Sequence, residues 1–462
     1  MAHGHTATLQ PEKLDIGGVS SRIGVPALFI GVIALGFAAY KGLHGNEDLV
    51  LHFYHAYLAA FTFFMAITLG SLAFVLIHHL ARAGWSTTVR RIAEGLSLNI
   101  FLLVIMIIGF FVPVNGETGA HRLLHHWMTF DPNVANPDDV LKAKYGYLNP
   151  QFFAIRMGVY LVVWCLIAWY YASQSAKQDE TGDPRISVRL ELLAKPAMIF
   201  FGFSLTAFII DWVMSLNAHW FSTIFGVYFF AGCMLSAFSS ITLLTMTLQK
   251  RGLIGPAVGH EHYHDLGKWM FAFTFFWGYI AFSQYMLIWY ANLPEETQFY
   301  IPRQFEGWVV VSLMLLIVHL LIPFPGLLSR HVKRSNKVLA FWAVWSLCAC
   351  AVDIFWLVVP NQFINKLPER AAEMTPDGSK EMYLTKAFDI VSDPHNIYHM
   401  KTPELTTLVN YPLTRDPMII TILCFIGFGG LYIFSTMLAL RGKSLVPTRD
   451  PRLNEALAFE NI

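Results

Sequence analysis

Two eight-residue segments of this chain end in an acidic residue within otherwise apolar runs. The segment SLTAFIID, residues 204–211, ends in Asp211, and the segment SLCACAVD, residues 346–353, ends in Asp353. Each aspartate follows a lysine by sixteen residues. A carboxylate at the centre of a membrane helix costs about 2.5 to 3.5 kcal/mol on insertion scales. A chain that places such a group twice, at matching positions, is expected to use both.

Composition identifies the class of protein. Of 462 residues, 55% are hydrophobic and only 14% are charged, and the uncharged runs are longer than a soluble core requires. The net charge of +1, without a basic stripe, gives no indication of nucleic-acid binding. The polar N-terminal segment lacks the apolar centre of a cleaved signal peptide. We predict an all-α, polytopic membrane protein with ten spanning helices, near 24–43, 52–80, 92–114, 149–173, 196–217, 221–248, 266–291, 306–328, 336–359 and 417–441.

The distribution of lysine and arginine predicts the orientation. With a cytoplasmic N-terminus, the short outer loops contain only Lys41 and Arg303, and the inner loops contain the other short-loop basic residues. This asymmetry predicts that both termini are cytoplasmic. The long connections 115–148 and 360–416 then face outside. There they either dock extrinsic partners or remain loops without a partner.

The chain also repeats itself. The motif HFY at 52–54 and the motif HWF at 219–221 each open a long helix that ends in a basic residue, alanine or arginine, and glycine. The second predicted helix thus corresponds to the sixth, and the fifth corresponds to the ninth. This implies a parallel repeat of two four-helix bundles plus two flanking helices. The predicted parts are a cytoplasmic tail 1–23, a flanking helix and loop 24–51, bundle I 52–217 with the outer loop 115–148, bundle II 218–359, an outer loop 360–416, a flanking helix 417–441 and a cytoplasmic tail 442–462.

Helix geometry assigns depths to the polar residues. At 1.5 Å per residue, Asp211 and Asp353 lie at one level in the outer half of the membrane. Unpaired carboxyl groups in this setting can carry protons. We predict a proton path in two half-paths, separated by an apolar layer around Phe208. The outer level contains Asp211, Asp353, Arg156, His219, Gln284 and His55, and the inner level contains Glu94, His78 and His319.

Structural alternatives exist for these residues. Arg156 could neutralise one aspartate in an ion pair. Glu94 lies one helical turn from Arg90 and Arg91, so it could form an ion pair at the helix end. Histidines near helix ends are often satisfied by a backbone carbonyl.

Redox cofactors have few candidate ligands. The five cysteines lie within predicted helices, and no Cys-x-x-Cys motif occurs, so iron–sulfur clusters and covalent haem are excluded on ligand grounds. A b-type haem between His78 or His79 and His319 stays open. The histidine-rich segment 259–265 lies in a predicted inner loop without a closing ligand set, and we expect a linker there. No metal site is predicted.

Long strings of the sequence resemble a known family. The segment DWVMSLNAHWFSTIFGVYFFAG, residues 211–232, resembles the signature of the ActF subunit of alternative complex III, a bacterial quinol:cytochrome c oxidoreductase. The segments HAYL at 55–58, GSL at 70–72 and RRIAE at 90–94 are similar to the same family. The resemblance covers most of 50–360. Asn217 departs from it, since many relatives are expected to have an aspartate there, so an outer proton exit would use His219 or water instead.

The resemblance has functional implications. ActF is similar to the NrfD and polysulfide-reductase membrane subunits, with two four-helix bundles. It implies an electron-transport subunit without its own redox centre, a proton-conducting bundle, and menaquinone or ubiquinone as the quinone. The implied partners are an ActC-like membrane subunit, the iron–sulfur protein ActB, the c-haem proteins ActA and ActE, and membrane lipids. A secondary transporter and a structural anchor for extrinsic subunits are the alternatives.

Overall fold

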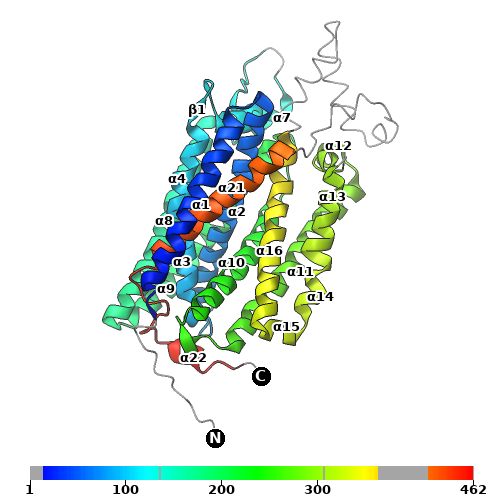
Figure 1. Cartoon of the computed structure of the whole chain (residues 1–462). Helices are drawn as coiled ribbons and strands as arrows, with labels where there is room; N and C mark the ends of the chain where they lie inside the picture. Colours follow the sequence, from blue (N-terminus) through cyan, green and yellow to red (C-terminus); the bar gives the residue numbers. More distant parts are fainter. Residues whose placement is uncertain (1–13, 135–136, 305–306, 363–414, 461–462) are drawn as a thin grey trace.

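The computed structural model describes residues 14–134, 137–304, 307–362 and 415–460 (Figure 1). Within these residues, ten helical segments are long and apolar enough to cross a membrane. The only sheet in the described part is a two-stranded hairpin of β1, Pro113–Val114, and β2, Glu117–Thr118. The predictions of an all-helical fold and of a multi-pass membrane protein are therefore confirmed.

The spanning segments correspond to the ten predicted ranges, and four of them consist of more than one helical element. Asn99 lies at the break between α3 and α4 and donates its side-chain amide to the Leu96 carbonyl, a local bond that competes with the helical ladder. The spanning helices are α1 Gly17–Leu43, α2 Glu47–Leu80, α3 Thr87–Ser97 with α4 Ile100–Phe111, α8 Pro150–Thr181, α9 Arg185–Trp212 with η2 Met214–Leu216, α10 Phe225–Lys250, α11 His260–Ala291, α13 Gly307–Met314 with η5 Leu315–Leu321 and α14 Pro323–Leu328, α16 Asn336–Val358 with η6 Val359–Asn361, and α21 Arg415–Leu440.

Helices α2 and α10 form the centre of the molecule. Almost the whole of α2 is buried, and α10 packs along it. Their contact is close because Gly70 has no side chain: a Cβ there would lie 2.0 Å from the Cys233 carbonyl oxygen. The two helices that the sequence repeat pairs are therefore packed against each other. Small residues permit such close helix contacts in membranes.

The other spanning helices surround this central pair. Helices α3, α4, α8 and α9 pack on or near α2, and we call this group with α2 bundle I. Helices α11 and α16 pack on α10, with α13, η5 and α14 beyond them, and we call this group with α10 bundle II. The flanking helices α1 and α21 lie side by side against α2 (Figure 1). The sequence boundaries of the domains stay a prediction.

The two ends of the helical body differ. At one end, which we call the terminal end, Asp15 pairs with Ser444, and residues 441–460 cover the bundle. The opposite end, which we call the loop end, contains the connections 112–149 and 292–304. Most of the predicted outer loop 360–416 lies outside the described residues, and the side of the membrane on which each end lies stays a prediction. The short helices are α5 Gly119–Leu123, α6 His125–Met128, α7 Asp139–Lys144, η3 Gly255–Ala257, α12 Pro294–Thr297, η4 Ile301–Arg303, α15 Arg330–Arg334 and α22 Leu453–Leu457.

Candidate functional site

Asp211 of bundle I forms an ion pair. Arg156 on α8 donates from Nη2 to Oδ1 of this buried carboxylate at 2.8 Å and from Nε to both carboxylate oxygens at 3.2 Å. The guanidinium also donates to the Tyr147 carbonyl at 2.7 Å and lies 3.7 Å from the centre of the Tyr147 ring. The charge of Asp211 is therefore balanced within the bundle, as the ion-pair alternative anticipated.

Asp353 of bundle II has a different environment. The Tyr228 hydroxyl on α10 donates to Oδ1, and the Trp277 indole on α11 donates to Oδ2 at 3.0 Å. The side chain is 2% exposed. Among the described residues, neither lysine nor arginine pairs with it, so no cation offsets the charge of its ionised form. The sequence repeat makes Asp211 and Asp353 equivalent, but only Asp353 is a buried carboxyl group without a counter-ion.

A small void adjoins Asp353. It has a volume of about 10 Å³, and its polar lining comprises Tyr228, Ser236, Cys350 and Asp353. This volume is at the lower limit for one water molecule, and the lining supplies the two to four polar partners that a buried water needs. The void extends the polar environment of Asp353 along α16 to Cys350, about one helical turn away.

His319 continues this polar line. Its Nε2 lies 3.8 Å from the Cys350 sulfur, and its ring stacks on Trp277 with centroids 3.7 Å apart. Nδ1 is buried and has no hydrogen-bond partner in the described part of the chain. The residue lies in η5, a π-helical segment. Such segments often occur at functional sites.

The grouping of His319 with Glu94 and His78 stays a prediction, and the contacts of His319 lie in bundle II. His319 contacts Trp277 and Cys350 in bundle II, whereas Glu94 belongs to α3 in bundle I. A count of residues from a helix end estimates depth but does not determine which helices face each other. The π-helical segment adds a further deviation, because it changes the number of residues per turn.

Glu94 belongs to a buried ionic cluster at the terminal end. Its carboxylate lies 3.1 Å from Arg91 Nε and 3.7 Å from Arg90 Nε. Arg91 also binds Asp179 at 2.8 Å, and Arg90 binds Asp450 of the C-terminal segment. We call these five residues the terminal ion cluster. Its pairs indicate a structural role for Glu94.

The remaining histidines of the predicted path have local partners. His78 Nδ1 lies 2.7 Å from the Phe74 carbonyl, and His55 Nδ1 lies 2.9 Å from the Leu51 carbonyl. These are bonds within α2, as the structural alternative anticipated. His55 Nε2 is buried without a hydrogen-bond partner in the described residues. The hydrogen bonds described for these two histidines therefore lead to the backbone of α2 and not to Asp211 or Asp353.

His219 lies at the loop end, where its Nε2 is 2.7 Å from an Asp138 carboxylate oxygen. Partial burial opposes ionisation of Asp138, but hydrogen bonds from the Leu141 N–H and from His219 hold its pKa below the usual value. Asp138 also caps the first turn of α7. His219 thus fastens the loop 115–148 to bundle I rather than contacting Asp211.

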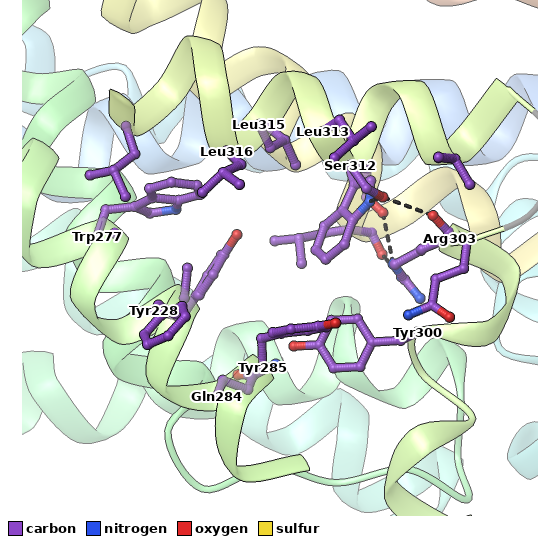
Figure 2. A pocket seen from close by; sticks show the side chains of 18 residues that line it. Tyr228, Trp277, Gln284, Tyr285, Tyr300, Arg303, Ser312, Leu313, Leu315 and Leu316 are labelled. Atoms are coloured by element: carbon purple, nitrogen blue, oxygen red, sulfur yellow. Dashed lines mark hydrogen bonds between the residues drawn. The ribbon is translucent and has the colours of Figure 1, made fainter. Parts of the chain in front are cut away.

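Bundle II contains a cavity of about 420 Å³ beside Tyr228 and Trp277 (Figure 2). Gln284, a predicted site residue, lines it. Tyr228, Trp277 and Arg303 also line the cavity and were not predicted as site residues. Arg303 could have been identified from the sequence, because it is one of two basic residues in the short loops predicted to face outside. No sequence feature distinguishes Tyr228 and Trp277, since aromatic residues are common in all ten predicted helices.

Comparison with protein-family models and with curated proteins returns no match. The resemblance of residues 211–232 to ActF therefore rests on the sequence alone. No cluster of three or more histidine, cysteine or acidic side chains suited to a metal ion occurs in residues 14–134, 137–304, 307–362 and 415–460.

Proposed function

We propose that this chain is an integral membrane subunit of a quinol:electron-acceptor oxidoreductase of the alternative complex III type. It holds no redox centre of its own, and it conducts protons through bundle II and binds quinone. One observation carries the proton-conducting part of the proposal: Asp353 is buried with hydrogen-bond donors on both carboxyl oxygens and, within the described part of the chain, without a counter-ion.

This environment suits a group that gains and releases a proton. An ionised carboxylate with no cation nearby is costly in a medium of low dielectric constant, and a proton on one oxygen removes that charge. The hydroxyl of Tyr228 can rotate to accept as well as donate. A water in the void beside Ser236 would connect Asp353 to Cys350, and His319 lies next along the line. Proton transfer requires such closely spaced polar groups.

The proposal includes partners and a membrane. The partners are an ActC-like membrane subunit, an ActB-like iron–sulfur protein and the c-haem proteins ActA and ActE. The quinone is menaquinone or ubiquinone, and the membrane is the bacterial inner membrane with both termini on the cytoplasmic side. The loops 115–148 and 360–416 then contact the extrinsic subunits. The support is the similarity of residues 55–94 and 211–232 to ActF, together with ten spanning helices.

Purification from the native membrane tests the assembly. A tagged chain should co-purify with c-haem and iron–sulfur proteins, detected by haem staining and mass spectrometry. A chain that is fully active alone would contradict the proposal and favour a secondary transporter.

Reconstitution of the purified complex tests the proton path. In vesicles, Asp353→Asn should abolish proton release coupled to quinol oxidation, because the amide cannot take up and return a proton. Asp353→Glu should retain part of the coupling. Unchanged coupling in assembled Asp353→Asn complexes would exclude Asp353 as a proton carrier.

A structural anchor is the second candidate, and bundle I favours it. Its acidic groups at both levels are paired, Asp211 with Arg156 and Glu94 with Arg90 and Arg91. An anchor would predict that neither Asp353→Asn nor Tyr228→Phe changes coupling, provided that the complex assembles.

A further inference from the structure

The 420 Å³ cavity of bundle II opens toward the surface that lipid would cover. Phe282, Leu313 and Leu316 line it and are 58%, 53% and 46% exposed on the outside of the helical body. Tyr228 and Trp277 line its deep end and are buried. Its volume lies within the range of about 300–1,000 Å³ for small-molecule sites. A ligand that enters between α11 and α13 would arrive from the bilayer, so it must be lipophilic.

The walls of the cavity suit a flat ring. Tyr285 and Tyr300 meet edge to face with centroids 5.2 Å apart, and Tyr300 continues to Trp356 at 6.4 Å. Figure 2 shows Tyr285, Tyr300 and Tyr228 around one space. Aromatic side chains pack against planar rings by offset stacking and edge contacts. A branched or bulky head group would use this surface less well.

Arg303 supplies a polar group at the end of the cavity opposite Trp277 (Figure 2). The guanidinium is fully buried and donates to the carbonyls of Phe299, Trp356 and Leu357, the last two at 3.1 and 2.9 Å. These bonds use three of its five N–H groups. Burial lowers the pKa of Arg303 below its usual value, but the group stays charged at neutral pH. No carboxylate pairs with it in the described part of the chain.

The polar groups of the cavity therefore lie at two places. Arg303 can donate to a ligand oxygen at one end. Near the other end, the Tyr228 hydroxyl donates to Asp353. Arg303 is the only charged residue among those that line the cavity, so the site suits oxygen atoms on a neutral ring better than the several oxygens of a phosphate head group.

We infer that this cavity binds the ring head of a prenylated quinone, with one ring oxygen toward Arg303 and the opposite edge toward Tyr228. The inference rests on the proposed function and gives it a binding site. It makes the ligand a neighbour of the hydrogen bond between Tyr228 and Asp353. Binding and the protonation of Asp353 are then coupled through one hydroxyl group.

Direct binding tests the site without partners or turnover. The full-length chain is reconstituted in phosphatidylcholine nanodiscs and titrated with the short-chain quinones menaquinone-1 and decylubiquinone, with tryptophan fluorescence as the readout. Ala281→Phe fills the cavity without removing a polar group, and it should weaken binding at least tenfold. Ala272→Phe on the same helix, at an exposed position outside the cavity, is the matched control and should bind as the unaltered chain does.

A photoreactive azidoquinone adds a second measurement, because cross-linked peptides should come from residues 277–285 and 300–316. Equal binding by the Ala281→Phe and Ala272→Phe chains, or cross-links confined to other segments, would overturn the inference. Displacement of the quinone by added phosphatidylglycerol, without displacement by added phosphatidylcholine, would identify an anionic lipid as the occupant and would also overturn it.

These outcomes separate the inference from the proposed function. If quinone does not bind here but Asp353→Asn abolishes coupling, the cavity inference fails and the proton path stands. If quinone binds but Asp353→Asn leaves coupling unchanged, the site stands and the proton path fails.

Discussion

Substitution by asparagine should affect a different property at each of the two aspartates of the repeat. Asp211→Asn removes the partner of a buried guanidinium, whereas Asp353→Asn removes a carboxyl group that has no counter-ion. We therefore expect Asp211→Asn to reduce stability and Asp353→Asn to reduce function. The contrast follows from the partners of each carboxyl group rather than from the sequence around it.

The magnitudes follow from these contacts. Breaking a buried ion pair costs about 3 to 5 kcal/mol. The cost for Asp211→Asn should lie near the lower value, about 3 kcal/mol, because Arg156 keeps its bond to the Tyr147 carbonyl and its contacts with the Tyr147 and Phe152 rings. Asp353→Asn retains one acceptor oxygen but turns an NH₂ group toward one of two donors. The loss of that single hydrogen bond costs about 1 kcal/mol.

Unfolding in mixed micelles with increasing SDS would measure both values in the full-length chain. The double variant Arg156→Met with Asp211→Asn should recover part of the loss, since it leaves no unpaired charge. Equal losses of stability for the two single aspartate variants would refute the distinction, as would a stable Asp211→Asn chain.

Three further predictions concern other parts of the fold. Gly70→Ala should destabilise the chain by about 1 to 3 kcal/mol, because the new Cβ would clash with the Cys233 carbonyl. Gly202→Ala is the control and should be tolerated in the same unfolding assay, because no atom lies within 4 Å of the Cβ that it adds. Asp450→Asn should cost about 3 kcal/mol by leaving Arg90 with only the longer contact to Glu94, and limited proteolysis should then release the C-terminal segment. Phe208 is buried among aromatic rings below Asp211, so Phe208→Glu should raise passive proton leak in vesicles and Phe208→Leu should not. An unchanged leak in the Phe208→Glu chain would count against an apolar barrier in bundle I.

The sequence predicted the helices well because their signal is local. Runs of about 20 apolar residues have few alternatives in a membrane, and all ten spanning segments were found, with ends that differ from the predicted ones by up to eleven residues. The correspondence between α2 and α10 was also visible in their motifs. The interruptions at Asn99 and in η5 could not be predicted, because they depend on local hydrogen bonding that apolar composition does not encode.

The candidate site was predicted less completely, because the pairing of side chains from different helices depends on tertiary packing. From sequence alone, the aspartate that pairs with Arg156 could not be determined. The sequence grouped His319 with Glu94 and His78 because residue counts estimate depth and do not identify the helix that a side chain faces. It also passed over Tyr228 and Trp277, whose roles arise only where α10, α11 and α16 meet.

The internal repeat explains why the two bundles can differ. A duplicated unit begins with the same buried carboxyl group in each half. The free-energy cost of burying that group must then be offset separately in each copy. In bundle I, the positive charge of Arg156 offsets this cost, and the ion pair strengthens the packing of α8 and α9. In bundle II, two neutral donors, Tyr228 and Trp277, bind the carboxyl group, and both of them line the cavity. A carboxyl group that is held without a fixed counter-charge can change its protonation state, so the proposed proton chemistry belongs in bundle II.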